Sequence, residues 1–89
     1  MPTYVIGYDL NTPGQDYGEL FEAIKSYGLW WHHLDSTWII RTERSAVEVR
    51  DHLKRFIDKN DKLLVAKLTS EAAWTGINQK GSKWLKDYL

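Results

Sequence analysis

Residues 4–10 read Tyr4-Val5-Ile6-Gly7-Tyr8-Asp9-Leu10, a run rich in β-branched and aromatic side chains. Such a run, followed at once by turn-forming residues, is typical of a β-strand. Because nearly every residue in it is apolar, we expect a strand that is covered on both faces and lies at the centre of a sheet. Asp9 is placed at the carboxyl end of this strand, beside the loop that follows.

The next elements outward are a helix and a hairpin. Apolar residues recur at helical spacing over residues 17–27 and predict a helix that Gly28 terminates. The aromatic segment 29–34 has no helix cap and is interpreted as a strand. A tight turn at residues 35–36 connects it to a second strand over residues 37–42, so a β-hairpin is expected.

A second helix and a fourth strand follow the hairpin. Ser45 and Glu48 have the spacing of a capping box, which marks a helix start. Behind them one apolar stripe continues along the predicted helix: Ala46, Val49, Leu53, Phe56 and Ile57. Residues 62–68 predict the fourth strand. In the tail, residues 69–89, a short final helix could form over residues 82–89. The tail contains Trp74 and Trp84, which need cover either on the open face of the sheet or on a partner chain.

The order of elements predicts an α+β fold. With right-handed crossovers, strand-helix-strand-strand-helix-strand closes as a ferredoxin-like βαββαβ sandwich, an antiparallel four-stranded sheet with two helices on one face and a C-terminal tail. We expect a single domain over residues 1–89, with its core in residues 3–68. The other face of the sheet would stay open, and an open face in a chain with five Trp predicts a homodimer.

Composition narrows the classes of protein further. The 89 residues include twelve basic and twelve acidic side chains and no cysteine, which argues against a strongly cationic nucleic-acid binder and excludes disulfide or thiolate chemistry. Residues 1–40 carry five acids and one base, whereas residues 41–89 carry eleven bases and seven acids. No apolar run approaches the roughly 18 residues of a membrane span, and the N-terminal residues lack signal-peptide features, so we expect a cytoplasmic protein without membrane contact.

Asp9 is the strongest candidate for chemistry. A carboxylate at the end of a central strand could ligate a hard cation such as Mg²⁺, which needs one or two protein carboxylates plus water and phosphate oxygens. In a two-fold dimer the two Asp9 side chains could share one such site. The alternative is a carboxylate that caps its own loop by accepting backbone hydrogen bonds.

His32 and His33 are the second candidates. Neighbouring strand residues point to opposite faces, so only one of them can face a given site, where it could act as a general base near neutral pH. The alternative is a ring that packs on Trp30 or Trp31. A third group could contact phosphates of RNA or DNA, although acidic neighbours dilute its charge: Arg41, Arg44, Arg50 and Lys54, with Arg55 beside them.

Three segments together resemble a known superfamily. They are residues 4–10, Tyr27-Gly28, and the hairpin segment Leu34-Asp35-Ser36-Thr37-Trp38-Ile39-Ile40. The chain is similar over residues 3–68 to the small CRISPR-associated ferredoxin-like endonucleases, the virulence-associated protein D toxins and the SinR-like bacterial proteins near them. The resemblance implies that Asp9 is the metal ligand of a dimeric, Mg²⁺-dependent nuclease and that Ser36, the nearest match to a hairpin serine, takes part in catalysis.

Three functional hypotheses follow. The first is a homodimeric nucleic-acid-handling protein that hydrolyses phosphodiesters of RNA or DNA with Mg²⁺, with Asp9, His33 and Ser36 as candidate catalytic residues. The second is a non-catalytic dimeric scaffold or a toxin–antitoxin-like interaction module, since some members of the superfamily are architectural dimers. The third is a regulatory module for a small molecule. Fold alone does not choose among them.

Overall fold

The computed structural model describes residues 1–12, 14 and 16–89 as an α+β fold. Its elements, in chain order, are β1 (Thr3–Asp9), α1 (Gly18–Lys25), β2 (Leu29–Leu34), β3 (Thr37–Arg41), α2 (Ala46–Lys54), β4 (Lys62–Lys67) and α3 (Gln79–Tyr88). The four strands form one antiparallel sheet in the order β2-β3-β1-β4. The first strand therefore has a neighbour on each side, as predicted. The expectation that both of its faces are covered is wrong, because Val5 and Gly7 on the second face are only half-buried.

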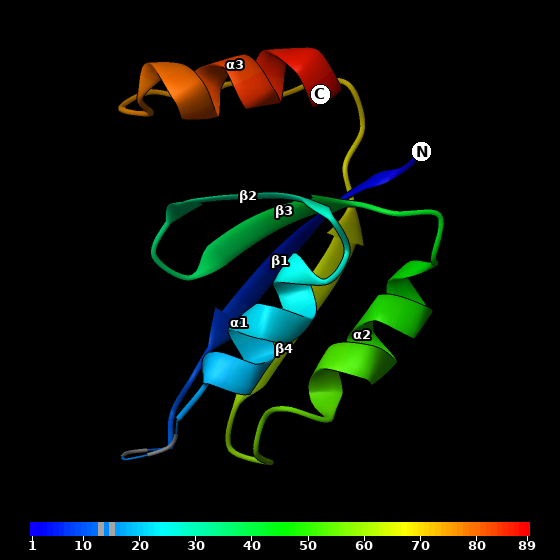
Figure 1. The fold of residues 1–89 in the computed structure, drawn as a ribbon, viewed down its shortest axis with the longest axis vertical. Helices are drawn as coiled ribbons and strands as arrows, with labels where there is room; N and C mark the ends of the chain where they lie inside the picture. Colours follow the sequence, from blue (N-terminus) through cyan, green and yellow to red (C-terminus); the bar gives the residue numbers. More distant parts are fainter. Residues whose placement is uncertain (13, 15) are drawn as a thin grey trace.

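One face of the sheet carries α1 and α2 (Figure 1). Alternate residues of a strand point to the same face, and in β1 the buried ones are Tyr4, Ile6 and Tyr8. They pack with buried side chains of β3 and of both helices: Leu20, Ala23, Ile24, Trp38, Ile40, Val49 and Leu53. The indole of Trp38 donates a 3.0 Å hydrogen bond to the Tyr8 hydroxyl, so the polar atoms of both large aromatics are satisfied inside this core.

The expectation of two helices and a tail needs correction, because the tail contains a third helix. Figure 1 shows α3 on the side of the sheet opposite α1 and α2. A second core cluster joins Trp31 of β2, Ile39 of β3 and Leu85 of α3, all buried. The Trp31 indole also donates a 3.1 Å hydrogen bond to the Gly81 carbonyl. The tail thus covers the β2–β3 half of this face in the same chain.

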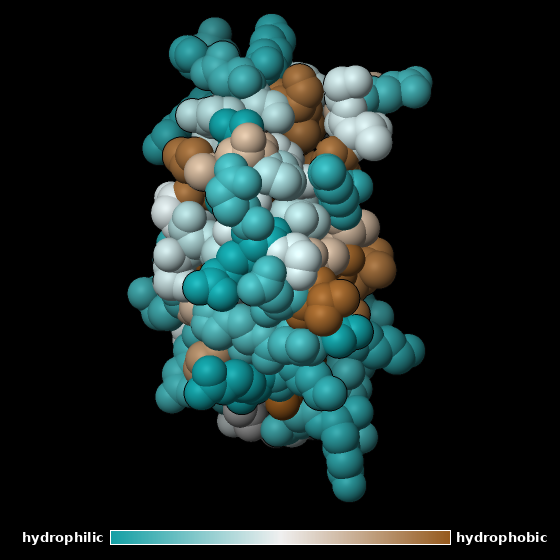
Figure 2. Space-filling view, turned by 90° about the vertical axis from the view of Figure 1, so that its right-hand side faces the viewer, coloured by the Kyte–Doolittle hydropathy of each residue, from teal (hydrophilic) through white to brown (hydrophobic). Residues whose placement is uncertain are grey.

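In the described residues, α3 leaves most of the β1–β4 half of the same face uncovered and reaches it only at Thr3, whose hydroxyl donates to the Tyr88 carbonyl at 3.5 Å. Val5 pairs with Ala66 and Gly7 with Leu64, and these residues alternate with the core positions of their strands. Leu64 is 63% exposed, which is high for a strand leucine. On the side seen in Figure 2, hydrophilic side chains predominate and apolar ones gather toward one edge.

Local sequence explains where the helices begin and end. The capping box at the start of α2 is complete: the Glu48 amide donates to the Ser45 hydroxyl and the Ser45 amide donates to the Glu48 carboxylate. The helix ends at Lys54, so Phe56 and Ile57 lie beyond it and are only half-buried, although they pack against the core. Gly28 follows α1 with a φ of +93°, a conformation that favours glycine.

Within the described residues, no helix has the length and apolar character that crossing a bilayer requires.

The helix layer generates the first testable prediction. Leu53 of α2 is completely buried between helices and sheet, so Leu53→Ala should lower the free energy of unfolding by about 2–5 kcal/mol through lost burial and a cavity. Val47, on the same helix, is 55% exposed, and Val47→Ala should stay within about 0.5 kcal/mol of wild type. Urea denaturation measures both; equal effects would contradict the orientation of α2.

Candidate functional site

The carboxyl end of β1 meets the β2–β3 turn and the start of β4 in a shallow hollow of about 370 Å³. Its lining includes two predicted site residues, Asp9 and Ser36, together with Thr37 and Lys62, which the sequence analysis did not single out. The Tyr8 amide donates a 3.2 Å hydrogen bond to the Ser36 carbonyl and fixes the turn beside the strand end. The fold therefore brings Asp9 and Ser36 together.

Asp9 presents its side chain at the rim of the uncovered half-face. It alternates with Tyr8 and shares the face of Val5 and Gly7, and it is exposed. In the antiparallel register it lies opposite Lys62. Among the residues that the structure describes, none donates a hydrogen bond to its carboxylate; only the Asp9 carbonyl accepts one, from the Asn11 side chain at 3.4 Å. Asp9 therefore does not cap its loop within the described residues.

Asp61, in the loop before β4, anchors the loop after β1. Its carboxylate accepts hydrogen bonds from the Asn11 amide at 2.7 Å, the Asp58 amide at 2.8 Å and the Tyr17 hydroxyl at 2.9 and 3.0 Å. It thereby joins the loop after β1 to the loop before β4. Partial burial, the largest influence, raises the pKa of Asp61, but these hydrogen bonds together hold it below its ordinary value.

The hollow offers a metal ion few ligands from one chain. In the part of the chain that the structure describes, no three His, Cys, Asp or Glu side chains are grouped to hold a metal. Asp9 is the one carboxylate in the described lining, and Ser36 and Thr37 add hydroxyl oxygens. Mg²⁺ is commonly held by one or two carboxylates with several waters, so Asp9 fits such an ion best when a second carboxylate joins it.

The two histidines lie on opposite faces, as their adjacency predicted. The His32 ring stacks on Trp38 in the helix layer, with ring centroids 3.8 Å apart. His33 is exposed and lies beside α3, where its ring atoms would be 3.0–3.1 Å from a Cβ placed on Gly81. His33 is not among the residues that line the Asp9 hollow. The structure thus separates this candidate base from Asp9 and Ser36.

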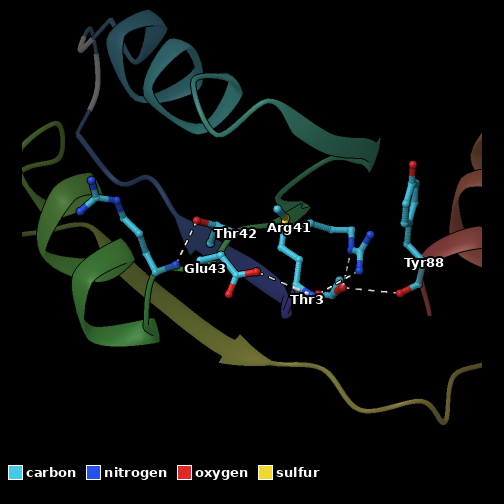
Figure 3. Close-up of polar contacts among 7 residues, drawn as sticks. Thr3, Arg41, Thr42, Glu43 and Tyr88 are labelled. Carbon is cyan, nitrogen blue, oxygen red and sulfur yellow. Dashed lines mark hydrogen bonds and ion pairs between the residues drawn. The ribbon is translucent and has the colours of Figure 1, made fainter.

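The four predicted phosphate contacts do not form one surface. Arg41 is held at the sheet end near both termini: its guanidinium donates to the Met1 carbonyl at 2.9 Å and to the Thr3 hydroxyl at 3.3 Å, and it lies 4.6 Å from the Tyr88 ring (Figure 3). Arg44 pairs with Glu48 across one turn of α2. The remaining two, Arg50 and Lys54, line a different hollow that also contains Asp58 and Asp61.

In comparisons with known proteins, no family model matches the sequence and no solved structure gives a significant match. The function must therefore be inferred from the site. The sequence analysis identified Asp9 and Ser36, which the structure places together. It missed Lys62, which antiparallel pairing with β1 would have placed opposite Asp9. It also missed the anchoring role of Asp61, for which the sequence contains no signal beyond a helix-breaking Asn-Asp pair.

The anchoring role of Asp61 can be tested by pH. A carboxyl group whose folded pKa is depressed contributes stability that is present above its unfolded pKa, near 3.9, and lost as the pH falls through the lower folded pKa. The stability difference between wild type and Asp61→Asn should therefore be constant above about pH 5 and shrink below about pH 4. Asp58→Asn removes a carboxylate from the same loop; an equal loss of stability in both variants would contradict the account.

Proposed function

We propose that the protein works as a homodimer that acts on nucleic acid, with the Asp9 carboxylates of both copies holding Mg²⁺ for phosphodiester hydrolysis. One observation carries the proposal: the exposed Asp9 side chain stands at the rim of the uncovered apolar half of the sheet. Two copies that packed through this half-face would bring their Asp9 side chains toward each other. A single contact would then supply both the dimer and the second carboxylate of the metal site.

The half-face has the character of an association surface. Val5 and Ala66 lie at its centre, Leu64 projects from it, and α3 covers mainly the neighbouring half. A stable interface needs about 800 Å² from each copy. That is a modest share of the 5983 Å² that one chain exposes. The placement of β1 between β3 and β4, with α1 and α2 on one face, supports the ferredoxin-like assignment, in which a sheet face is free for association.

The proposed chemistry assigns each residue of the hollow a role. A divalent cation at the Asp9 pair would activate water and stabilise charge on the phosphate. Lys62, opposite Asp9, supplies a positive charge for the phosphate backbone, and the Ser36 hydroxyl supplies a hydrogen bond. His33 takes no part in this arrangement because it does not line the hollow and lies instead beside Gly81 of α3.

A non-catalytic dimeric scaffold is the second candidate. It is favoured by the contacts that several arginines make within their own chain. Arg41, Arg44 and Arg50 each contact groups of their own chain, and Arg50 pairs with Asp51 at 2.9 Å. Nucleic-acid affinity depends on cations that are available to neutralise phosphates. If these contacts persist in the assembly, the same dimer would serve as an interaction module.

The association surface predicts the effect of a charge on it. Leu64→Lys should convert the dimer to a monomer, because two lysines would face each other in a contact that excludes water. Val47→Lys places the same charge on the exposed side of α2 and should leave the dimer intact. Sedimentation velocity at tens of micromolar measures both. A wild-type monomer under these conditions, or a Leu64→Lys dimer, would refute the proposed surface.

The metal site predicts the effect of removing one charge. Asp9→Asn keeps the size of the side chain but loses the anionic oxygens that Mg²⁺ requires, so cleavage of RNA or DNA in Mg²⁺ or Mn²⁺ should fall by more than about 100-fold while the dimer stays folded. Asp35→Asn, which removes an exposed carboxylate from the adjacent turn, is the matched control. Equal cleavage by wild type and Asp9→Asn would overturn the assignment. A dimer that cleaves nothing would favour the scaffold.

A further inference from the structure

A second hollow of about 430 Å³ lies in the helix layer, where α1 ends beside α2. Ser26 and Tyr27 line it from the end of α1, and Arg44, Glu48, His52 and Arg55 line it from α2 and its flanks. The last four recur at spacings of four, four and three residues, which places them on one side of a helix. This hollow is separate from the Asp9 hollow. The Asp9 hollow lies at the carboxyl end of β1, whereas α1 begins near that end and runs back, so that the end of α1 lies toward the start of the strand.

The charge in this hollow is positive. The Arg44 guanidinium lies 3.6 Å from one Glu48 carboxylate oxygen, and the other oxygen accepts from the Ser45 amide of the capping box. Glu48 is thus already engaged twice, and hydrogen bonding to Ser45 holds its pKa below the ordinary value. No carboxylate of the described residues lies within ion-pair distance of Arg55, whose nearest charge-related contact is the Phe56 ring at 5.9 Å. The lining therefore holds two guanidinium groups but only one carboxylate, which pairs with Arg44 and leaves Arg55 without an anionic partner among the described residues.

Neutral donors accompany the two arginines. The Tyr27 hydroxyl and His52 Nδ1 are 2.8 Å apart and hold each other in place across the two helices. Burial raises the pKa of the Tyr27 hydroxyl, and the nearby Arg44 charge lowers it by less, so the group stays protonated at neutral pH. A hydroxyl that donates to Nδ1 leaves the hydrogen of a neutral imidazole on Nε2, so His52 can donate in turn. The Ser26 hydroxyl lies in the same lining.

This set of groups matches a compact dianion. Guanidinium forks bind phosphate oxygens in pairs, and the imidazole Nε2–H that Tyr27 holds in place adds a further hydrogen bond. The hollow has room for a phosphate with a small group attached. The adjoining hollow, which shares Ser26 and His52 with it, has an acidic lining that does not suit a second phosphate: Asp16, Glu19 and Glu22. We propose that Arg44, Arg55 and the Tyr27–His52 pair form a binding site for the dianionic phosphate of a phosphomonoester. Such a phosphate could belong to a mononucleotide-sized molecule or to the 5′ end of a nucleic acid.

The test is a titration followed by amide resonances of the ¹⁵N-labelled full chain. Inorganic phosphate should shift the signals of residues 26–27 and 52–55 and saturate, and Arg55→Gln should weaken that binding by about tenfold or more. Arg50→Gln is the matched control, because Arg50 lies on the same helix but pairs with Asp51 outside this hollow. Absence of saturable shifts here, or equal weakening by both variants, would overturn the proposal.

Two further titrations test whether the site requires a phosphomonoester and which kind of molecule carries that phosphate. Dimethyl phosphate, a monoanionic diester, should bind at least about tenfold more weakly than phosphate; equal binding would refute a monoester site. A preference for adenosine 5′-monophosphate over a 5′-phosphorylated oligonucleotide identifies a small-molecule ligand, and the reverse preference identifies a nucleic-acid end.

Two more variants control for folding and for the Asp9 site. Tyr27→Phe keeps the ring and removes the hydroxyl donor, so it should weaken phosphate binding without unfolding the chain; unchanged binding would contradict the role of the Tyr27–His52 pair. Asp9→Asn should bind phosphate as wild type does, because the two hollows share no residue. The failure of one proposal is therefore distinguishable from the failure of the other.

Discussion

The docking of α3 on one half of the sheet is the constraint on which the rest of the molecule depends. The Trp31 indole reaches the Gly81 carbonyl, and Leu85 fills the space beside Ile39. A side chain at residue 81 would disturb this docking, because a Cβ on Gly81 would lie 2.7 Å from Ile77 Cγ2 and 3.0 Å from a ring carbon of His33 in β2. Because the ten-residue helix covers β2 and β3 and reaches only the first residue of β1, Thr3, much of the β1–β4 half remains open with Asp9 at its rim.

This division of the sheet separates two kinds of surface. The uncovered half is apolar at its centre, where Val5 and Ala66 pair, and polar at the end that holds Asp9 and Lys62. The helix layer on the other side carries the arginines of α2 and its flanks. The opposite charges of the two halves of the sequence therefore do not form an acidic face and a basic face. Local pairs such as Arg44–Glu48 and Arg50–Asp51 neutralise much of the basic half.

Most of the local structure was predictable from short-range patterns. The β-branched and aromatic run of β1, the capping box at Ser45 and the glycine after α1 each act within a few residues, and the structure contains all three elements where they were expected. The closeness of Asp9 and Ser36 was also within reach, because a strand end and a hairpin turn meet at one end of a sheet. These features depend on backbone geometry that the sequence determines locally.

The features that were missed depend on contacts between distant residues. The sequence indicated a short final helix but not that Trp31, fifty residues away from Gly81, would hold it in the same chain. Asp61 anchors the loop after β1 through Asn11 and Tyr17, which lie more than forty positions earlier. Tyr27 acquires its partner, His52, only when α1 and α2 pack side by side on the sheet. No periodicity or spacing marks such pairs.

The central claim is that two copies meet through the β1–β4 half-face with their Asp9 residues close together. The chain contains no cysteine, so a spin label can be attached at one chosen position without background. Lys62→Cys places the label opposite Asp9, and Glu22→Cys places it on the exposed side of α1. Double electron–electron resonance in the dimer should give a clearly shorter distance between the two labels at residue 62 than between those at residue 22. A longer distance at residue 62 than at residue 22, or no dimer at all, would contradict the account.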